Sequence, residues 1–174
     1  MDQREEQAFA DYFAARRDTV RRTAYLICGD WHRADDLTQT AFVALHRRWR
    51  KIRDQAALDA YVRRTLVRAA IDESRRPWRR EHSVETLPEQ PRTAGRDVVG
   101  DTIATRSALV EGLQQVPPRQ RAVLVLRFLE GQSVATVATA LNCSEGTVKS
   151  QTARGLDTLR AALGDALDDL RPTG

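Results

Sequence analysis

The chain has 174 residues and a formal net charge of +4; 30% of its residues are charged and 6% are aromatic. That length allows one medium domain or two small ones, and the abundant Ala, Leu and Arg favour helices. Because no apolar run is long enough to cross a membrane and the opening MDQREEQAF does not resemble a signal peptide, we expect a cytoplasmic protein.

Residues 7–81 show helical periodicity almost throughout, which predicts three helices. The first ends at Gly29, the second begins near Ala34, and the third runs from about Ala57 to Arg76, where Pro77 stops it. Their apolar faces consist of Phe9, Phe13, Val20, Ala24 and Ile27; Leu37, Ala41, Leu45 and Trp49, widened by Phe42 and Val43; and Leu58, Tyr61, Val62, Leu66 and Ile71. The two cysteines, Cys28 and Cys143, lie far apart without metal-ligand spacing, so we expect two buried thiols and neither a metal nor a cofactor.

Positive charge is concentrated in residues 46–80, which contain 12 Arg or Lys against 4 Asp or Glu. Such a segment is either a solvated helix face or a surface that binds nucleic-acid phosphates. Charge alone leaves both interpretations open.

A stretch rich in proline, glycine and acidic residues follows, with the sequence SVETLPEQPRTAGRDVVGD. Its apolar residues recur with no sustained helical or strand period. An irregular stretch of this length argues against one compact domain. We therefore predict a first domain over residues 1–82, a flexible linker over 83–104 and a second domain over 105–174.

The second domain is helical again. One helix ends before Pro117 and Pro118, and the next includes Leu124, Leu126 and Phe128, for which a core position is favoured over a surface one. No segment shows the alternation of apolar and polar residues that is typical of a strand. The predicted fold class is therefore all-α, with two small helical domains.

The segment SVATVATALNCSEGTVKSQTARGLDTLRAAL has the layout of a helix-turn-helix, with two helices, shorter than those before them, joined by a tight turn at Asn142 and Cys143. Asn142 suits the left-handed conformation that the tight turn needs, and Ser144 is a good N-cap for the second helix. The outward positions of that helix are polar or small, as expected of a helix that enters the major groove. An ordinary helical hairpin with a solvated surface is the alternative.

The chain resembles the extracytoplasmic-function sigma factors of RNA polymerase, and within them the actinobacterial sigma-E-like group. The resemblance depends on the order and spacing of three sequence segments: TAYLICGDWHRADDLTQTAFVALHRRW, AYVRRTLVRAAIDESRR and LQQVPPRQRAVLVLRFLEGQSVATVATALNCSEGTVKSQTARGLDTLRAAL. It implies a region 2-like first domain that binds the polymerase clamp and the promoter −10 element. It also implies a region 4-like second domain that binds the −35 element and the flap.

The resemblance assigns three sets of site residues. The polymerase-binding set is Asp35, Asp36, Gln39 and Phe42; the −10 set is Tyr61, Arg63, Arg64, Arg68, Arg75 and Arg76; the −35 set is Arg119, Thr147, Lys149, Ser150, Ala153 and Arg154. From the residues alone, compensation of a helix N-terminus is the favoured explanation of Asp35 and Asp36. Many members have Asn where this chain has Arg68, so the −10 preference is not transferred from relatives.

The resemblance implies two partners, promoter DNA and core RNA polymerase, which is bound through the clamp helices of its largest subunit and through the flap tip. It is also compatible with an anti-sigma factor as a third partner. The free protein is expected to bind DNA poorly, because two weak sites act together only when the polymerase fixes their separation. The alternative is a stand-alone helix-turn-helix regulator, which usually binds as a dimer. An enzyme is not expected, because His32, His46 and His82 show no catalytic or metal-ligand spacing.

Overall fold

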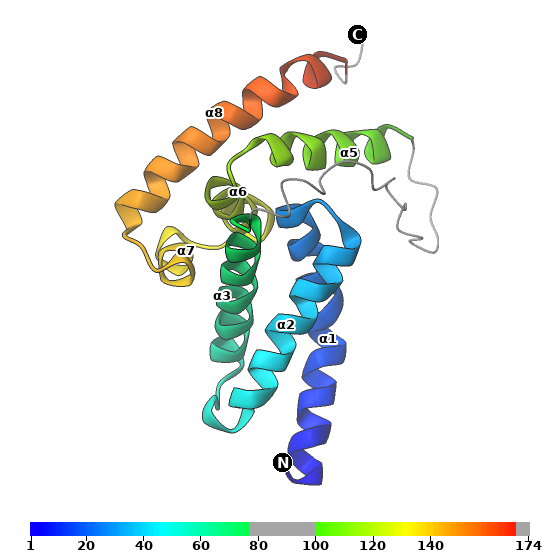
Figure 1. The fold of residues 1–174 in the computed structure, drawn as a ribbon, viewed down its shortest axis with the longest axis vertical. Helices are drawn as coiled ribbons and strands as arrows, with labels where there is room; N and C mark the ends of the chain where they lie inside the picture. The colour runs from blue at the N-terminus through cyan, green and yellow to red at the C-terminus, as the bar shows by residue number, and fades with distance from the viewer. Residues whose placement is uncertain (77–99, 170–174) are drawn as a thin grey trace.

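The computed structural model describes residues 1–76 and 100–169, and these ranges contain only helices (Figure 1). The predicted all-α fold class is confirmed. In chain order the elements are α1 (Gln3–Cys28), α2 (Trp31–Arg48), the 3-10 helix η1 (Trp49–Lys51), α3 (Gln55–Ser74), α5 (Gly100–Gln115), α6 (Pro118–Leu124), the π-helical η2 (Val125–Leu129), α7 (Val134–Leu141) and α8 (Glu145–Asp169). Among the described residues, no helix is both long and apolar enough to span a membrane.

The predicted linker, residues 83–104, lies outside the described residues as far as residue 99. Its last part differs from the prediction, because α5 begins at Gly100. Prolines and acidic residues marked the irregular stretch, but residues 100–104 carry no proline, so they can continue the following helix.

Short polar side chains set the helix starts in the first half. Asp2 and Glu5 form a reciprocal capping box at the start of α1. Gly29 ends α1 in the left-handed conformation, at φ 76°, as predicted. The Asp30 carboxylate accepts the Arg33 backbone N–H at 2.9 Å, so α2 begins at Trp31 and not near Ala34. The apolar stripe of α2 begins a few residues after its N-cap. The start of the helix was therefore predicted too far along the chain.

The helices α1, α2 and α3 pack side by side around a core that is aromatic at one end (Figure 1). The Phe13 ring meets Phe42 edge-on at 4.8 Å, and Phe9 meets Trp49 in the same way at 5.3 Å. Edge-to-face pairs of this kind add to the free energy of burial. The amphipathic stripes predicted for this half therefore form its core.

In the second half, α8 is a 25-residue helix against which α5, α6 and α7 pack. The prediction that both helices of the helix-turn-helix are shorter than those before them was therefore wrong for the second one. The prediction that Phe128 lies in the core was also wrong, because its side chain is 55% exposed while Leu124 and Leu126 are buried. The chain changes from α to π winding at Val125, which rotates the later side chains away from the direction that a continuous α-helix would give them.

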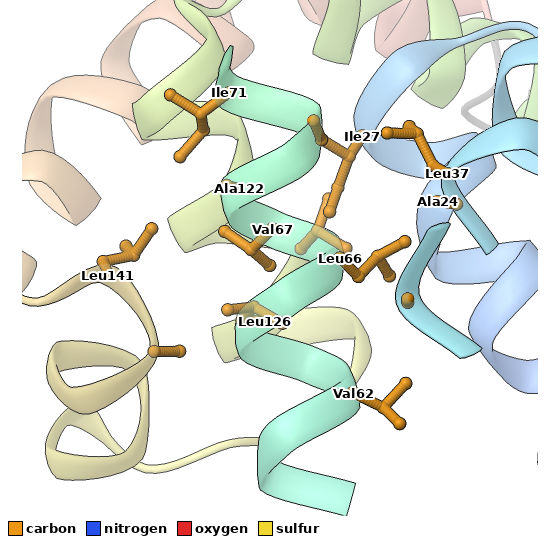
Figure 2. Packing of buried hydrophobic residues seen from close by; sticks show 14 of the residues in the cluster. Ala24, Ile27, Leu37, Val62, Leu66, Val67, Ile71, Ala122, Leu126 and Leu141 are labelled. Atoms are coloured by element: carbon orange, nitrogen blue, oxygen red, sulfur yellow. The ribbon is translucent and has the colours of Figure 1, made fainter. Parts of the chain in front are cut away.

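The two halves share one buried cluster, with α3 between them. Val67 of α3 is fully buried beside α6, η2 and α7, where Leu126 and Leu141 also lie (Figure 2). Val62 and Leu66 of the same helix take part in the cleft shared with α1. Buried residues thus run without a break from one half into the other.

Candidate nucleic-acid and protein-binding surfaces

A row of exposed arginines follows one side of α3. At 100° per residue, Arg64, Arg68 and Arg75 share this side, and Arg76 follows just past the end of the helix. None of the four guanidinium groups forms an ion pair with a carboxylate of the described residues. We call these four residues the α3 arginine stripe; it presents unneutralised positive charge to solvent.

Tyr61 lies on the same side of α3, at the start of the stripe. Its hydroxyl donates to the Ala44 carbonyl at 3.5 Å, and the Arg64 guanidinium lies 6.0 Å from its ring centroid. A half-buried aromatic ring beside a cation is a surface on which an unpaired base can stack.

Arg63, also predicted for the −10 surface, points elsewhere. One residue before Arg64 on the helix, it faces the second half, and its Nε lies 3.4 Å from Oε2 of Glu130. Its side chain is only 18% exposed. In this conformation Arg63 belongs to the contact between the halves and is separated from the stripe.

Two caps and one left-handed residue build the helix-turn-helix. Ser133 caps α7 by accepting the Thr136 N–H, and Ser144 caps α8 by accepting the Thr147 N–H, both at 3.1 Å. Between them Asn142 takes φ 53° and ψ 53°, as predicted from its side chain. This geometry fixes how the first turns of α8 project from the domain.

The first turns of α8 present most of the predicted −35 residues to solvent. Lys149, Ser150, Ala153 and Arg154 are exposed, while fully buried Val148 anchors the opposite side. Thr147 is half-buried and its hydroxyl lies 2.9 Å from that of Ser144, so part of its hydrogen-bonding capacity serves the cap. The exposed face therefore combines two cations, one hydroxyl and one methyl group.

Arg119 and Arg121 lie two residues apart on α6 and have different surroundings. Arg119, predicted to contact DNA, donates through Nη2 to the Leu141 carbonyl at 3.1 Å and caps the end of α7. It is half-buried, and this bond uses one of its five donors. Arg121, which the sequence did not single out, is inserted between the two halves.

The Arg121 guanidinium donates to four backbone carbonyls. Two belong to the end of α5, Leu113 at 2.6 Å and Gln114 at 3.2 Å; the third is Val116, just after α5, at 2.9 Å, and the fourth is Ile27 of α1, at 2.7 Å. Burial lowers the pKa of Arg121 to about 10, so it stays charged at neutral pH. Carbonyls at two helix ends take the place of a carboxylate partner.

The side of α2 that carries the predicted polymerase contacts is acidic and borders a groove. Asp36 and Gln39 are exposed, whereas Asp35 is held by Arg21, whose Nε and Nη2 lie 2.5 and 3.3 Å from its carboxylate oxygens. The groove, of about 680 Å³, runs between α1 and α2 and includes Gln39 and Val43, the latter 43% exposed.

Phe42, predicted as a polymerase contact, is only 3% exposed. Its ring packs against Phe13 and Tyr12, so it forms part of the floor of the groove. The α2 stripe that buries Ala41 and Leu45 includes position 42, which explains why this side chain points inward. Within the groove, the exposed apolar side chain is that of Val43.

Three further groups, Tyr12, Tyr25 and Cys28, have raised pKa values, with burial as the main cause. Burial and the hydrogen bond from its hydroxyl to Asp59, at 2.7 Å, raise the pKa of Tyr12. Burial raises the pKa of Cys28 to about 11, so its thiol is protonated at neutral pH. Cys28 is buried as expected, but Cys143 is half-buried. In the described ranges no three His, Cys, Asp or Glu side chains form a group that could hold a metal.

The two halves match two family models. Residues 12–80 match Sigma-70 region 2, and residues 106–159 match Sigma-70, region 4. Over 155 residues the chain is 37% identical to the RNA polymerase sigma-E factor of Streptomyces coelicolor, covering 89% of this chain and 85% of that one. Over 157 residues it is 32% identical to the ECF RNA polymerase sigma factor SigM of Mycobacterium tuberculosis, covering 90% and 78%.

The chain belongs to the extracytoplasmic-function sigma factors of RNA polymerase. The family resemblance seen in the sequence is confirmed, and this sigma factor directs transcription initiation. A stand-alone helix-turn-helix regulator would leave the region 2 match unexplained.

The sigma factor also shares its fold with a solved structure, that of the sigma factor RpoE in complex with the anti-sigma factor NepR from Bartonella quintana. The TM-score is 0.69 at 20% sequence identity, and the match covers 91% of this chain and 98% of that one. At this identity the likeness concerns the fold alone.

Proposed function

We propose that the sigma factor recognises a promoter with two separate surfaces, one for each of two elements. The α3 arginine stripe and Tyr61 bind the −10 element, and the exposed start of α8 binds the −35 element. The observation that carries this proposal is the presence, on one chain, of a row of unpaired arginines on α3 and a helix-turn-helix with a capped, solvent-facing second helix.

At the −10 element the stripe acts mainly on phosphates. Each phosphate neutralised on a single strand contributes about 0.7 to the slope of binding against salt, so four arginines supply a strongly salt-dependent term. Extruding a base from the duplex costs a few kcal/mol, and stacking on Tyr61 offsets part of that cost. Arg68 either binds phosphate or donates to a guanine.

At the −35 element the start of α8 enters the major groove. Lys149 and Arg154 can donate to guanine, Ser150 can donate or accept, and the methyl group of Ala153 can contact thymine. Arg119, with donors left over from its bond to Leu141, binds a backbone phosphate at the edge of the site. Thr147 contributes through the part of its side chain that the cap leaves accessible.

Core polymerase contacts both halves. Asp36 and Gln39, exposed beside the α1–α2 groove, bind the clamp helices, while Asp35 contributes less because Arg21 already holds it. In the second half Phe128 and Leu129, 55% and 47% exposed on η2, form an apolar contact for the flap tip. Residues 1–82 and 105–174 then act as two binding units.

The sigma factor makes and breaks no bond itself, and RNA synthesis belongs to the polymerase. It acts in the cytoplasm, where its template and polymerase are found. An anti-sigma factor is a further proposed partner, since the Bartonella sigma factor of similar fold was crystallised with one.

The test is promoter-dependent transcription by purified core polymerase, with and without the sigma factor, on genomic promoter fragments. Specific transcripts are expected only when the sigma factor is present. Asp36→Arg should abolish them and reduce core binding by at least about tenfold, because a cation replaces the exposed carboxylate that faces the clamp.

Glu111→Arg is the matched control, since it makes the same charge change at an exposed position on α5. It should leave transcription unchanged. Absence of core binding by the wild-type protein, or equal loss in both variants, would contradict the proposed docking surface.

A further inference from the structure

One carboxylate lies among the arginines on the exposed side of α3. Asp72 is exposed and follows Arg68 by four residues and precedes Arg75 by three. Side chains at these spacings are neighbours on a helix surface, where opposite charges commonly pair. A carboxylate repels phosphates, so an acidic residue within a phosphate-binding surface weakens it unless the residue has a task of its own.

The Asp72 side chain has no partner among the described residues. Its carboxylate forms neither a hydrogen bond nor an ion pair there, although the spacing to Arg68 and Arg75 would allow one. By contrast, Arg160 and Asp157 of α8 lie 4.0 Å apart at a three-residue spacing. The end of α3 does not need the side chain either, because the Arg75 backbone N–H donates to the main-chain carbonyl of Asp72. Both carboxylate oxygens are therefore free to accept hydrogen bonds from a ligand.

Asp72 lies on a different edge of the exposed side from the arginines. At 100° per residue, Arg64, Arg68 and Arg75 are turned about 60°, 20° and 40° to one side of Tyr61. Asp72 is turned about 20° to the other side, and Thr65 about 40°. We call Tyr61, Thr65 and Asp72 the polar edge of α3.

The hydroxyl of Thr65 is free as well. Other helical threonines turn the hydroxyl back to the carbonyl four residues earlier, as Thr38 does to Ala34 and Thr152 does to Val148, both at 2.7 Å. Half-buried Thr65 forms no such bond, nor any other with the described residues. The polar edge thus offers a ring, a hydroxyl and a carboxylate, which together suit bases better than phosphates.

The chemistry of a carboxylate narrows the group that it can bind. An ionised aspartate accepts hydrogen bonds and donates none. In the major groove the donors on base edges are the amino groups of cytosine and adenine. The adenine amino group lies beside N7, an acceptor that repels a second acceptor, so aspartate pairs best with N4 of cytosine.

We propose that Asp72 reads a cytosine of the −10 element by accepting a hydrogen bond from its exocyclic amino group. The inference rests on the proposed function, because it assumes that α3 binds the −10 element. Arg68 and Arg75, about one turn before and after Asp72, hold the neighbouring phosphates and offset the repulsion between the carboxylate and the DNA backbone.

The cytosine is a different base from the one that stacks on Tyr61. Tyr61 and Asp72 are eleven residues apart, or about 16 Å along the helix axis. That distance corresponds to at most about five base pairs of duplex at about 3.4 Å each. The proposal therefore places the cytosine, on either strand, within about five positions of the stacked base.

A base contact and a solvated side chain predict opposite results when Asp72 is removed. A solvated carboxylate only repels DNA, so its loss would raise the affinity for every −10 sequence by a similar factor, roughly two- to fivefold. Loss of a base contact lowers the affinity for the promoter with cytosine and leaves the other three bases equal or better bound. A folding defect gives neither pattern, because it lowers the affinity for all sequences.

The experiment measures the binding of core polymerase carrying the sigma factor to duplex promoter probes. The probes are one promoter that the sigma factor transcribes and its variants with each −10 position changed singly to the other three bases. The wild type should prefer cytosine at one position by roughly tenfold. Asp72→Ala should abolish this preference and leave the other positions unchanged. Asp72→Asn should shift it to adenine, because an amide pairs with both N6 and N7 of adenine.

Two controls make the result specific. Glu111→Ala removes the same charge at an exposed site on α5 and should keep every wild-type preference. Arg75→Ala, three residues from Asp72, should lower the affinity for all probes alike while the preference for cytosine persists. Together they separate the loss of a base contact from a general change of charge.

A uniform rise in affinity for all probes in Asp72→Ala would overturn the inference. Wild-type binding without a preference for cytosine at any −10 position would also overturn it, as would unchanged preferences in Asp72→Asn. These failures are separable from failure of the proposed function, because loss of −10 binding on removal of Arg64, Arg68 and Arg75 does not depend on Asp72.

Discussion

The two DNA-facing helices differ in how much of their surface the fold leaves free. α3 is buried on two sides, with Leu66 toward α1 and Val67 toward the second half, and its exposed side carries Arg64, Arg68 and Arg75 together with Ala60 and Asp72. The start of α8 is anchored on one side by Val148 and shows a mixed face. A row of arginines suits phosphates, and mixed chemistry suits base edges. The surroundings of each helix thus match a different kind of recognition.

The largest expected effect comes from releasing α3 from the second half. Arg121→Ala leaves carbonyls of α1 and α5 without their donor and should lower the free energy of unfolding by about 2–3 kcal/mol. For a protein of this size that corresponds to about 5–10 °C in Tm. Thermal unfolding followed by circular dichroism measures it.

Arg119→Ala is the matched control, because it removes a single bond from the same helix and should cost about 1 kcal/mol or less. Equal destabilisation by the two variants would mean that the carbonyl cluster around Arg121 makes no special contribution to the contact between the two halves.

The next effect separates the two surfaces by their dependence on salt. The triple variant Arg64→Ala/Arg68→Ala/Arg75→Ala should reduce the salt slope of promoter binding by the polymerase complex by about 2. Affinity near physiological salt should fall by about fiftyfold, similarly for all −10 sequences. Binding titrations at several salt concentrations measure both quantities.

Exposed arginines outside the stripe give the control for this variant. Arg4→Ala/Arg106→Ala/Arg160→Ala removes the same charge, and the slope should barely change. If both triples lowered the slope equally, long-range charge and not the α3 stripe would account for the DNA affinity.

A smaller effect is expected at α8 and concerns sequence preference. Arg154→Ala should relax the preference at one −35 base pair by about 1–2 kcal/mol while leaving the salt slope nearly intact. Competition between −35 variants for the polymerase complex measures the preference. Arg160→Ala, further along α8, is the control; an unchanged −35 preference in Arg154→Ala would remove this residue from the base-reading surface.

The chemistry of neighbouring residues allowed the helices of the first half and the turn of the helix-turn-helix to be predicted. Apolar stripes marked the three helices of the first half, and Asn142 and Ser144 indicated the turn and the cap that the structure shows. The outward direction of Phe128 was not predicted, because it depends on a change to π winding.

The contact between the halves was also not predictable from the sequence. Arg121 lies in RQRAVLVL, where neither spacing nor neighbours distinguish a buried guanidinium from an exposed one. Glu130 occupies a predicted turn, yet its partners Thr23 and Arg63 lie 107 and 67 residues away along the chain. Periodicity reports which side of a helix is apolar but not which distant segment covers it.

The smallest expected effect compares one cysteine from each half. With a pKa of about 11, Cys28 is about one-thousandth thiolate at pH 8, and its rate of alkylation should rise with pH up to that pKa. Half-buried Cys143 should be modified first, which mass spectrometry of iodoacetamide-treated protein would show. Equal modification in the native state would mean that the end of α1 opens readily; in denaturant both cysteines should react.

The most direct test of two-surface recognition is a footprint of the polymerase complex on a cognate promoter. The wild-type sigma factor should protect separate patches at the −10 and −35 elements. The Arg64, Arg68 and Arg75 triple variant should weaken only the first patch, and Lys149→Ala/Arg154→Ala only the second. Loss of both patches together in either variant, or protection at a single element by the wild type, would contradict recognition by two independent surfaces.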